Sequence, residues 1–418
     1  VAANIVKSID FLCRPHPSRD VAVHVDTPER AYSKTVDLKT AAYSLLGIYM
    51  SSSGCPIMDK LRPMTRFHLP FATALETTYR SLANYLIAQY LFSLYGKTTD
   101  WALAHLSQIY EDIGTVNMAF HERLKEVSKQ NYALNAVLML DSFANFINMF
   151  LSNDISYDVE NLFNYDLEDQ SSPAESQEDF GNALSDSIAY KYQFNIGAKE
   201  AKNFTINIDR QSLRLINVSK DPLPSWTELT CHKCPNCPLD EKKHKYCPAA
   251  RGISESIEFF RQTLSIEEAD ITVKAAERNY FKHTSITNGI SSMMGLIMAS
   301  SGCPILGQLR PLVRNHLPFA SNNETVYRAM GMYLLSQHFL TKKGKKADWT
   351  LENFTKLYEN INIVNRAFCS RLKNSPIEDA SLNALVKLDC FAQIINFSVS
   401  KENIEELKSL FRAYFKEK

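Results

Sequence analysis

A stretch of 27 residues occurs twice in the chain, 248 positions apart. Residues 54–80 and residues 302–328 are identical at 17 of these positions. Further matches at this offset are Glu29 with Glu277, Arg30 with Arg278, Tyr32 with Tyr280 and Trp101 with Trp349. No insertion or deletion is needed from Val1 to about Ser152. A gap-free repeat of this length predicts two similarly folded units rather than a short-period solenoid.

The offset places Val1 opposite Ala249, directly after Cys247-Pro248. We therefore expect an upstream segment with its own cysteine cluster to precede residue 1. A longer reading frame without cysteines there would contradict this expectation.

Composition limits the class of protein. A chain of 418 residues is long enough for two or three domains, and 45% hydrophobic with 22% charged residues is ordinary globular material. Lys+Arg and Asp+Glu both number 46, which argues against a general nucleic-acid binder. No apolar run is long enough for a transmembrane helix, and the first residues show no signal-peptide pattern. Clustered rather than framework-spaced cysteines favour a reducing, cytoplasmic location.

Four segments follow from the repeat and the local patterns. We expect a first helical module at 1–152, an acidic linker at 153–186, a small antiparallel β module with the cysteine cluster at 187–248, and a second helical module at 249–418. The linker prediction is based on nine acidic residues and no Lys or Arg between Asn153 and Phe180. The predicted fold class is α+β, predominantly α-helical.

Helix signals repeat in both modules. Helices are expected at Asn4–Leu12, Leu38–Ser52, Leu134–Leu151, Gly252–Thr263, Ile286–Ser300, Leu382–Phe397 and Glu402–Phe415. Gly54 and Gly302 suit the left-handed position beyond a helix end. Thr73-x-x-Glu76 and Ser321-x-x-Glu324 are capping-box patterns, so both glutamates have a structural explanation.

Strand signals are fewer. Alternation of apolar and polar residues predicts strands at Val21–Val25 and Ile271–Lys274 within the modules. A three-stranded meander is expected at Tyr190–Ile196, Phe204–Ile208 and Leu213–Ile216.

The cysteine cluster is the candidate metal site. Cys231-x2-Cys234 with His244-x2-Cys247 has the spacing of a tetrahedral zinc site. A second grouping takes Cys231, Cys234, Cys237 and Cys247, which suits an iron–sulfur cluster. A third reading is four reduced thiols or a pair of disulfides without metal.

The repeated motif is the candidate ligand site. Its basic residues are Arg62, Arg66, His68 and Arg80 in the first copy, and Arg310, Arg314, His316 and Arg328 in the second. They can converge on a carboxylate or phosphate, because guanidinium groups bind such anions bidentately. The structural alternative is that they donate to carbonyls of a proline-rich loop, whose prolines supply no N–H groups.

Catalytic residues are not predicted. Cys55 and Cys303 follow a helix C-terminus, where the dipole disfavours a thiolate, so we interpret them as small buried thiols. No Ser–His–Asp order, phosphate loop or paired-carboxylate motif is evident.

The motifs resemble an uncharacterised bacterial family, a domain of unknown function. The residues that carry the resemblance are Trp226-Thr-Glu-Leu, Cys234-Pro-Asn-Cys237-Pro-Leu, Cys247-Pro, Ser301-Gly-Cys-Pro and His316-Leu-Pro-Phe-Ala. It covers one unit from about Tyr190 and the helical part of the other unit. The resemblance implies that Cys234, Cys237 and Cys247 are firmer ligands than Cys231 and His244, and it implies no activity.

Two functions follow as hypotheses. The first is a cytoplasmic metal-binding interaction or regulatory protein, holding zinc (alternatively an iron–sulfur cluster) and binding an unknown protein partner. The second is an enzyme or a small-anion-binding protein that uses the repeated Arg/Arg/His motif. Packing of the two units about a pseudo-twofold is a further hypothesis from the repeat.

Overall fold

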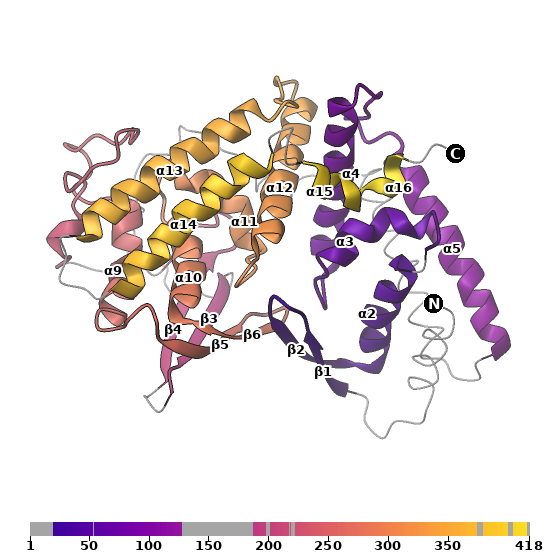
Figure 1. Cartoon of the computed structure of the whole chain (residues 1–418), viewed down its shortest axis with the longest axis horizontal. Coiled ribbons are helices and arrows are strands. Elements are labelled where there is room, and N and C mark those ends of the chain that lie inside the picture. Colours follow the sequence, from indigo (N-terminus) through magenta and orange to yellow (C-terminus); the bar gives the residue numbers. More distant parts are fainter. Residues whose placement is uncertain are drawn as a thin grey trace.

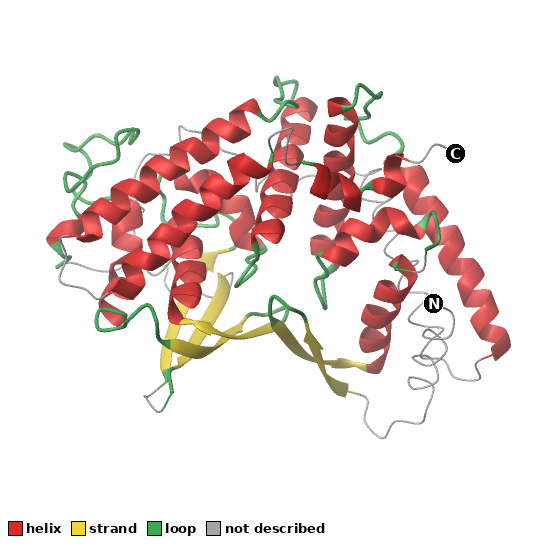
Figure 2. Ribbon diagram, in the orientation of Figure 1, coloured by secondary structure: helices red, strands yellow, loops and turns green. Residues whose placement is uncertain are grey.

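The computed structural model describes residues 20–127 except 53, residues 187–216 except 198–200, residue 218, and residues 222–373, 379–399 and 404–415. Helices cover one face of an antiparallel sheet in this part of the chain (Figures 1 and 2). The predicted α+β class with mostly helical content is therefore confirmed. The helices expected at Asn4–Leu12 and Leu134–Leu151 and the acidic linker lie outside the described residues.

One sheet runs through both modules. Its six strands are, in spatial order, β1 (Asp20–Asp26), β2 (Ala31–Asp37), β6 (Asn279–Ser285), β5 (Glu268–Lys274), β3 (Ser187–Asn195) and β4 (Lys202–Asp209). All neighbours are antiparallel. The modules meet where β2 pairs with β6, with Tyr32 opposite Tyr280. The small β module is thus a hairpin that extends this sheet through β5.

Two strand predictions need correction. Leu213–Ile216 is not a third strand of a meander, because it forms only an isolated bridge between Leu215 and Ile208. The chain turns sharply at Leu213, which has a φ of 54°. Beyond the turn the Ile216 N–H still donates to the Asn207 carbonyl of β4, but the Leu215 N–H donates to the Ser300 carbonyl, so pairing with β4 does not extend past this bridge. Strands β2 and β6 were not predicted, because polar residues interrupt their alternation.

The helices predicted at Leu38–Ser52 and Ile286–Ser300 match the structure to within one residue, whereas the helix predicted at Gly252–Thr263 lies four residues earlier, at Pro248–Phe259. The first module contains α2 (Leu38–Ser51), η1 (Met58–Leu61), α3 (Arg62–Arg66), α4 (Ala74–Leu94) and α5 (Leu106–Val127). The second contains α9 (Pro248–Phe259), α10 (Ile286–Ser300), η3 (Leu306–Leu309), α11 (Arg310–Arg314), α12 (Asn322–Lys342), α13 (Glu352–Lys373) and α14 (Asp379–Ser398), preceded by η2 (Ser225–Thr227). Gly54 and Gly302 have φ values of 78° and 90°, so both occupy the predicted left-handed position.

The closing helix differs from the prediction. Glu402–Phe415 is divided into α15 (Glu405–Leu410) and α16 (Arg412–Phe415), with Phe411 fully buried at the break. Both short helices lie beside the first module (Figure 1). The Asn84 amide donates to the Tyr414 hydroxyl at 3.0 Å, and Phe415 packs edge-on against Phe92. The end of the second module therefore contacts the first.

Contacts between the modules involve residue pairs that are 248 positions apart. A Cβ atom on Gly331 of α12 would lie 2.8 Å from the Cβ atom of Ala83 on α4, so these helices approach very closely. The Trp101 and Trp349 rings stack with centroids 4.3 Å apart. Contacts of this kind are what an approximate twofold relation between the modules requires.

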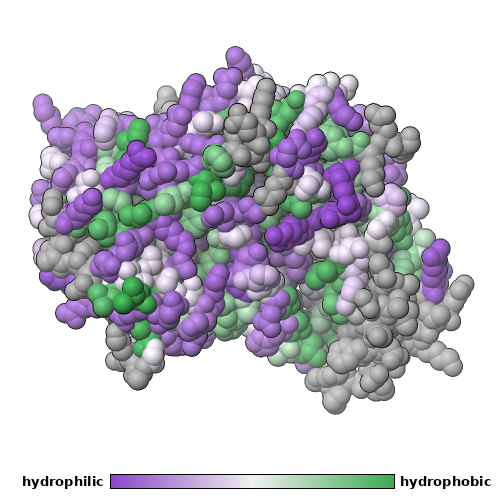
Figure 3. All heavy atoms as spheres, in the orientation of Figure 1, coloured by the Kyte–Doolittle hydropathy of each residue, from purple (hydrophilic) through white to green (hydrophobic). Residues whose placement is uncertain are grey.

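The visible surface is mostly hydrophilic, with hydrophobic side chains in short, interrupted groups (Figure 3). Among the described residues, no helix is both long enough and apolar enough to cross a membrane.

Candidate functional site

In each module, the loop that contains the repeated motif leads into a helix whose first turn has the predicted capping box. At α4 the Thr73 side chain accepts from the Glu76 N–H, and the Glu76 carboxylate accepts from the Thr73 N–H. Ser321 and Glu324 make the same reciprocal pair at α12. Both capping boxes are confirmed, and each leaves a buried carboxylate beside the other module.

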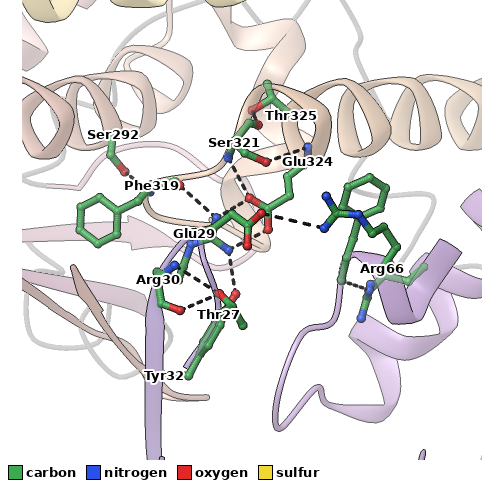
Figure 4. A network of polar contacts seen from close by, with 12 residues as sticks. Thr27, Glu29, Arg30, Tyr32, Arg66, Ser292, Phe319, Ser321, Glu324 and Thr325 are labelled. Carbon is green, nitrogen blue, oxygen red and sulfur yellow. Dashed lines mark hydrogen bonds and ion pairs between the residues drawn. The ribbon is translucent and has the colours of Figure 1, made fainter. Parts of the chain in front are cut away.

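Each of these carboxylates binds an arginine from the opposite module. The Arg278 guanidinium donates to both Glu76 carboxylate oxygens, at 2.9 and 2.6 Å. Arg30 donates to both oxygens of Glu324 in the same way (Figure 4). The two modules therefore exchange arginines, and each ion pair spans more than 200 residues of sequence.

The same arginines also hold the motif loops. Arg278 donates to the Phe71 carbonyl at 3.1 Å, and Arg30 donates to the Phe319 carbonyl at 3.0 Å. Both phenylalanines have a φ of 58°, a left-handed conformation that is unfavourable for a bulky residue. The arginines thus compensate for strained backbone at equivalent places in the two loops.

Charge is retained in these buried pairs. Burial alone would raise the pKa of the Glu76 carboxyl, but hydrogen bonds and charge attraction from Arg278 hold that pKa below its ordinary value. Arg30 lowers the pKa of Glu324 in the same way against burial. Removal of one partner from a buried pair typically costs about 3–5 kcal/mol, because the other charge is left uncompensated.

Four of the eight predicted motif residues lie at the wall of cavities in the two modules. Arg80 donates to the carbonyls of Met64 and Phe67, and Arg328 donates to those of Leu312 and Asn315. The expected carbonyl-capping role is therefore seen for this pair. Burial lowers the pKa of both guanidinium groups, so their positive charge is only partly compensated.

His68 and His316 differ in their partners. The His316 Nε2 atom lies 2.6 Å from the Tyr192 hydroxyl of β3, which also contacts Ser292. The His68 Nε2 atom is shielded from solvent and has no hydrogen-bond partner among the described residues. Burial, followed by the charges of nearby arginines, lowers the pKa of His68 to about 4 and that of His316 to about 3. Both rings are therefore neutral at physiological pH.

The other four predicted residues do not converge with these. Arg62 lies 3.7 Å from Asp59 and Arg66 lies 4.0 Å from Glu29, and the two arginine side chains are 40% and 52% exposed. Arg310 donates to the Ser212 carbonyl at 3.1 Å. Arg314 is half-buried, and its carbonyl accepts from the Tyr190 hydroxyl.

A cavity of about 460 Å³ lies in the second module between β6, α10, α12 and α14. Lys282, Arg328 and Lys387 line it together with His316, and no Asp or Glu is among its lining residues. Lys282 and Lys387 were missed from the sequence. Lys34 matches Lys282 at the 248-residue offset, which was an available signal, whereas nothing marked Lys387.

The first module has a cavity of about 250 Å³ at equivalent positions. Lys34, His68 and Arg80 line it, and its described lining also contains no Asp or Glu. A third, smaller cavity of about 70 Å³ lies between the modules. His68, Arg80, His316 and Arg328 line both the central cavity and a module cavity. These four residues are therefore the wall shared by neighbouring cavities.

The cysteine cluster is partly gathered. Cys234 and Cys247 are buried, and Cys247 occupies the position directly before the first residue of α9. Burial, and then the neighbouring Cys247 and Cys237 thiols, raise the pKa of Cys234 to about 12. Cys231 and His244 are half-buried. In the described part of the chain, no three His, Cys, Asp or Glu side chains are grouped so as to hold a metal ion. Zinc and iron–sulfur binding thus stay predictions.

The family assignment comes from two stretches that together cover most of the chain. Residues 1–164 and 188–412 match the model of a domain of unknown function, DUF6901. The chain belongs to this family. The two stretches are consistent with DUF6901 units in tandem. No curated protein and no solved structure matches the chain.

The neutral histidines predict a pH dependence for this DUF6901 chain. Below pH 6.5, the ordinary histidine pKa, the unfolded chain binds protons that folded His68 and His316 exclude. Stability therefore falls as pH decreases from 6.5 toward the folded pKa values, by up to about 1.4 kcal/mol per pH unit for each histidine. Urea unfolding between pH 7 and 5 measures this slope.

The double variant His68→Gln/His316→Gln is expected to flatten the slope, and exposed His24→Gln is the control that preserves it. An unchanged slope in the double variant would show that the two rings are not buried in neutral form.

Proposed function

We propose that this protein binds a small anion in the cavity of the second module. The observation that carries the proposal is the second-module cavity, where Lys282, Lys387 and Arg328 meet without a carboxylate in the lining. These cations come from β6, α14 and α12, so the tertiary fold brings them together.

The electrostatics of the lysines support an anionic ligand. Burial lowers the pKa of Lys282, and the nearby charge of Arg30 lowers it further, whereas the charges of Glu29 and Glu324 offset part of this shift. Burial and the charge of Lys282 lower the pKa of Lys387. An anion between the two ammonium groups would offset both burial and mutual repulsion, because opposite charge stabilises the charged form. The site therefore gains free energy from an anion that it cannot gain from a neutral molecule.

The remaining lining indicates the kind of anion. Asn288 and Ser292 supply polar groups, and Asn288 already contacts the Lys387 ammonium group. Leu296, Leu317 and Phe391 provide apolar wall. Because the Nη2 group of Arg328 already donates to two loop carbonyls, we assign the direct contacts with the anion mainly to the lysines, and the charge of Arg328 adds to the positive potential. This combination suits a carboxylate or phosphate group attached to a small apolar body.

The predicted test compares anions at fixed ionic strength. Inorganic phosphate is expected to raise the thermal unfolding temperature relative to chloride, because a ligand that binds only the folded state stabilises it. Lys282→Met/Lys387→Met removes both ammonium groups and should abolish the difference. Exposed Lys191→Met on β3 is the matched control. An equal response to phosphate in the wild-type chain and the double variant would reject the site.

A second candidate function is zinc binding through Cys234, Cys237 and Cys247. The observation that favours it is the proximity of these thiols: after burial, Cys247 and Cys237 raise the pKa of Cys234. Thiolates are ligands that zinc prefers, although these side chains would have to move together to coordinate it. Metal analysis of anaerobically purified protein separates zinc from iron, with loss of metal expected in Cys234→Ser. A folded, colourless, metal-free sample would reject both metals.

A further inference from the structure

Strand β1 is at the edge of the sheet, at the position in the first module that β5 has in the second. Strand β5 pairs with β6 on one side and with β3 on the other. Within the described residues, β1 pairs only with β2. Exposed edges are commonly blunted by proline or lysine, and β1 contains neither over its seven residues.

Burial differs between the two strands in the way that a missing neighbour would produce. Ile271 and Val273 of β5, which pairs with β3, are 1% and 0% exposed. Their equivalents in β1, Val23 and Val25, are only half-buried. An apolar stripe that is covered in one module is therefore accessible in the other.

A second, independent difference concerns the motif histidines. In the second module, Tyr192 of β3 reaches His316 Nε2. In the first module, the His68 Nε2 atom is shielded from solvent and has no hydrogen-bond partner among the described residues. A strand added to β1 in the manner of β3 would bring a side chain to this nitrogen atom.

We propose that the outer edge of β1 binds an antiparallel β-strand from a second protein chain. The register of β3 on β5 pairs Tyr192 with Val273 and Lys191 with Lys274. Transferred to β1, it places a tyrosine opposite Val25 and a lysine opposite Asp26. The lysine would then face an opposite charge, a favourable cross-strand pair. Backbone pairing of this kind is a recurrent mode of peptide recognition.

The incoming strand must differ from β3 in one respect. A Cβ atom on Gly289 of α10 would lie 2.5 Å from the Phe194 ring of β3. The first module has Ala41 at the position of Gly289. Phe194 pairs with Ile271, the equivalent of Val23. The bound strand therefore carries a residue smaller than phenylalanine opposite Val23.

Two synthetic peptides test the proposal on the full chain. Both span the hairpin Ser187–Asp209, one with the natural sequence and one with Phe194→Ala. We expect the Phe194→Ala peptide to bind tighter by roughly tenfold, because the crowding at Ala41 is relieved. Adding Tyr192→Phe to it should weaken binding by about two- to tenfold through loss of one hydrogen bond. Fluorescence anisotropy of labelled peptides measures both effects.

Hydrogen exchange and a matched variant of the chain test whether the peptide binds at the outer edge of β1. Outward-facing amides of β1 should exchange fast in the free chain and slowly with the Phe194→Ala peptide. Ala41→Gly should restore tight binding of the natural-sequence peptide. The proposal is overturned if neither peptide binds saturably, or if affinity is independent of residue 194. Protection of these amides in the free chain would also overturn it, because the chain itself would then cover the edge. Hydrogen exchange is measured on the unmodified chain, so this test does not depend on whether any variant folds.

Discussion

The exchange of Arg30 and Arg278 between the modules is the interaction on which the rest of the structure depends. Glu76 and Glu324 each cap the helix of their own module and neutralise an arginine of the other. Neither module alone contains the partner for its buried charge in this arrangement. An uncompensated buried charge is costly, so the two modules stabilise each other far more than a surface contact would. The β2–β6 pairing and the Trp101–Trp349 stack add to the same interface.

The exchanged pairs also fix the walls of the cavities. By holding the carbonyls of Phe71 and Phe319, the arginines set the path of the loops that carry His68 and His316. These histidines, with Arg80 and Arg328, separate each module cavity from the small central one. A bound anion and the interface between modules would therefore act on the same side chains. Anion binding in the proposed site is accordingly expected to stabilise the association of the modules.

Local features were predictable from the sequence because they depend on neighbouring residues. The capping boxes, the left-handed glycines and the span of α10 follow from short patterns, and the structure confirms them. The exchange of arginines between the modules was not predictable, because the sequence equally allows an ion pair between Glu76 and Arg30 of the same module. Lys387 was missed because α14 brings it to the same cavity as Lys282, which is 105 positions earlier in the sequence. Four of the eight basic motif residues line the cavities, whereas the other four do not converge with them. Lys387, one of the two lysines in the proposed anion site, lies outside the motif.

A double-mutant cycle measures the exchange directly. Arg30→Met and Glu324→Gln, alone and combined, give the coupling free energy across the modules, and Arg30→Met with Glu76→Gln gives the coupling within one module. Glutamine preserves the capping box in both cases. The exchanged arrangement predicts a coupling of about 2 kcal/mol or more for Arg30 with Glu324, and below about 0.5 kcal/mol for Arg30 with Glu76. Strong coupling of Arg30 to Glu76 with none to Glu324 would contradict it.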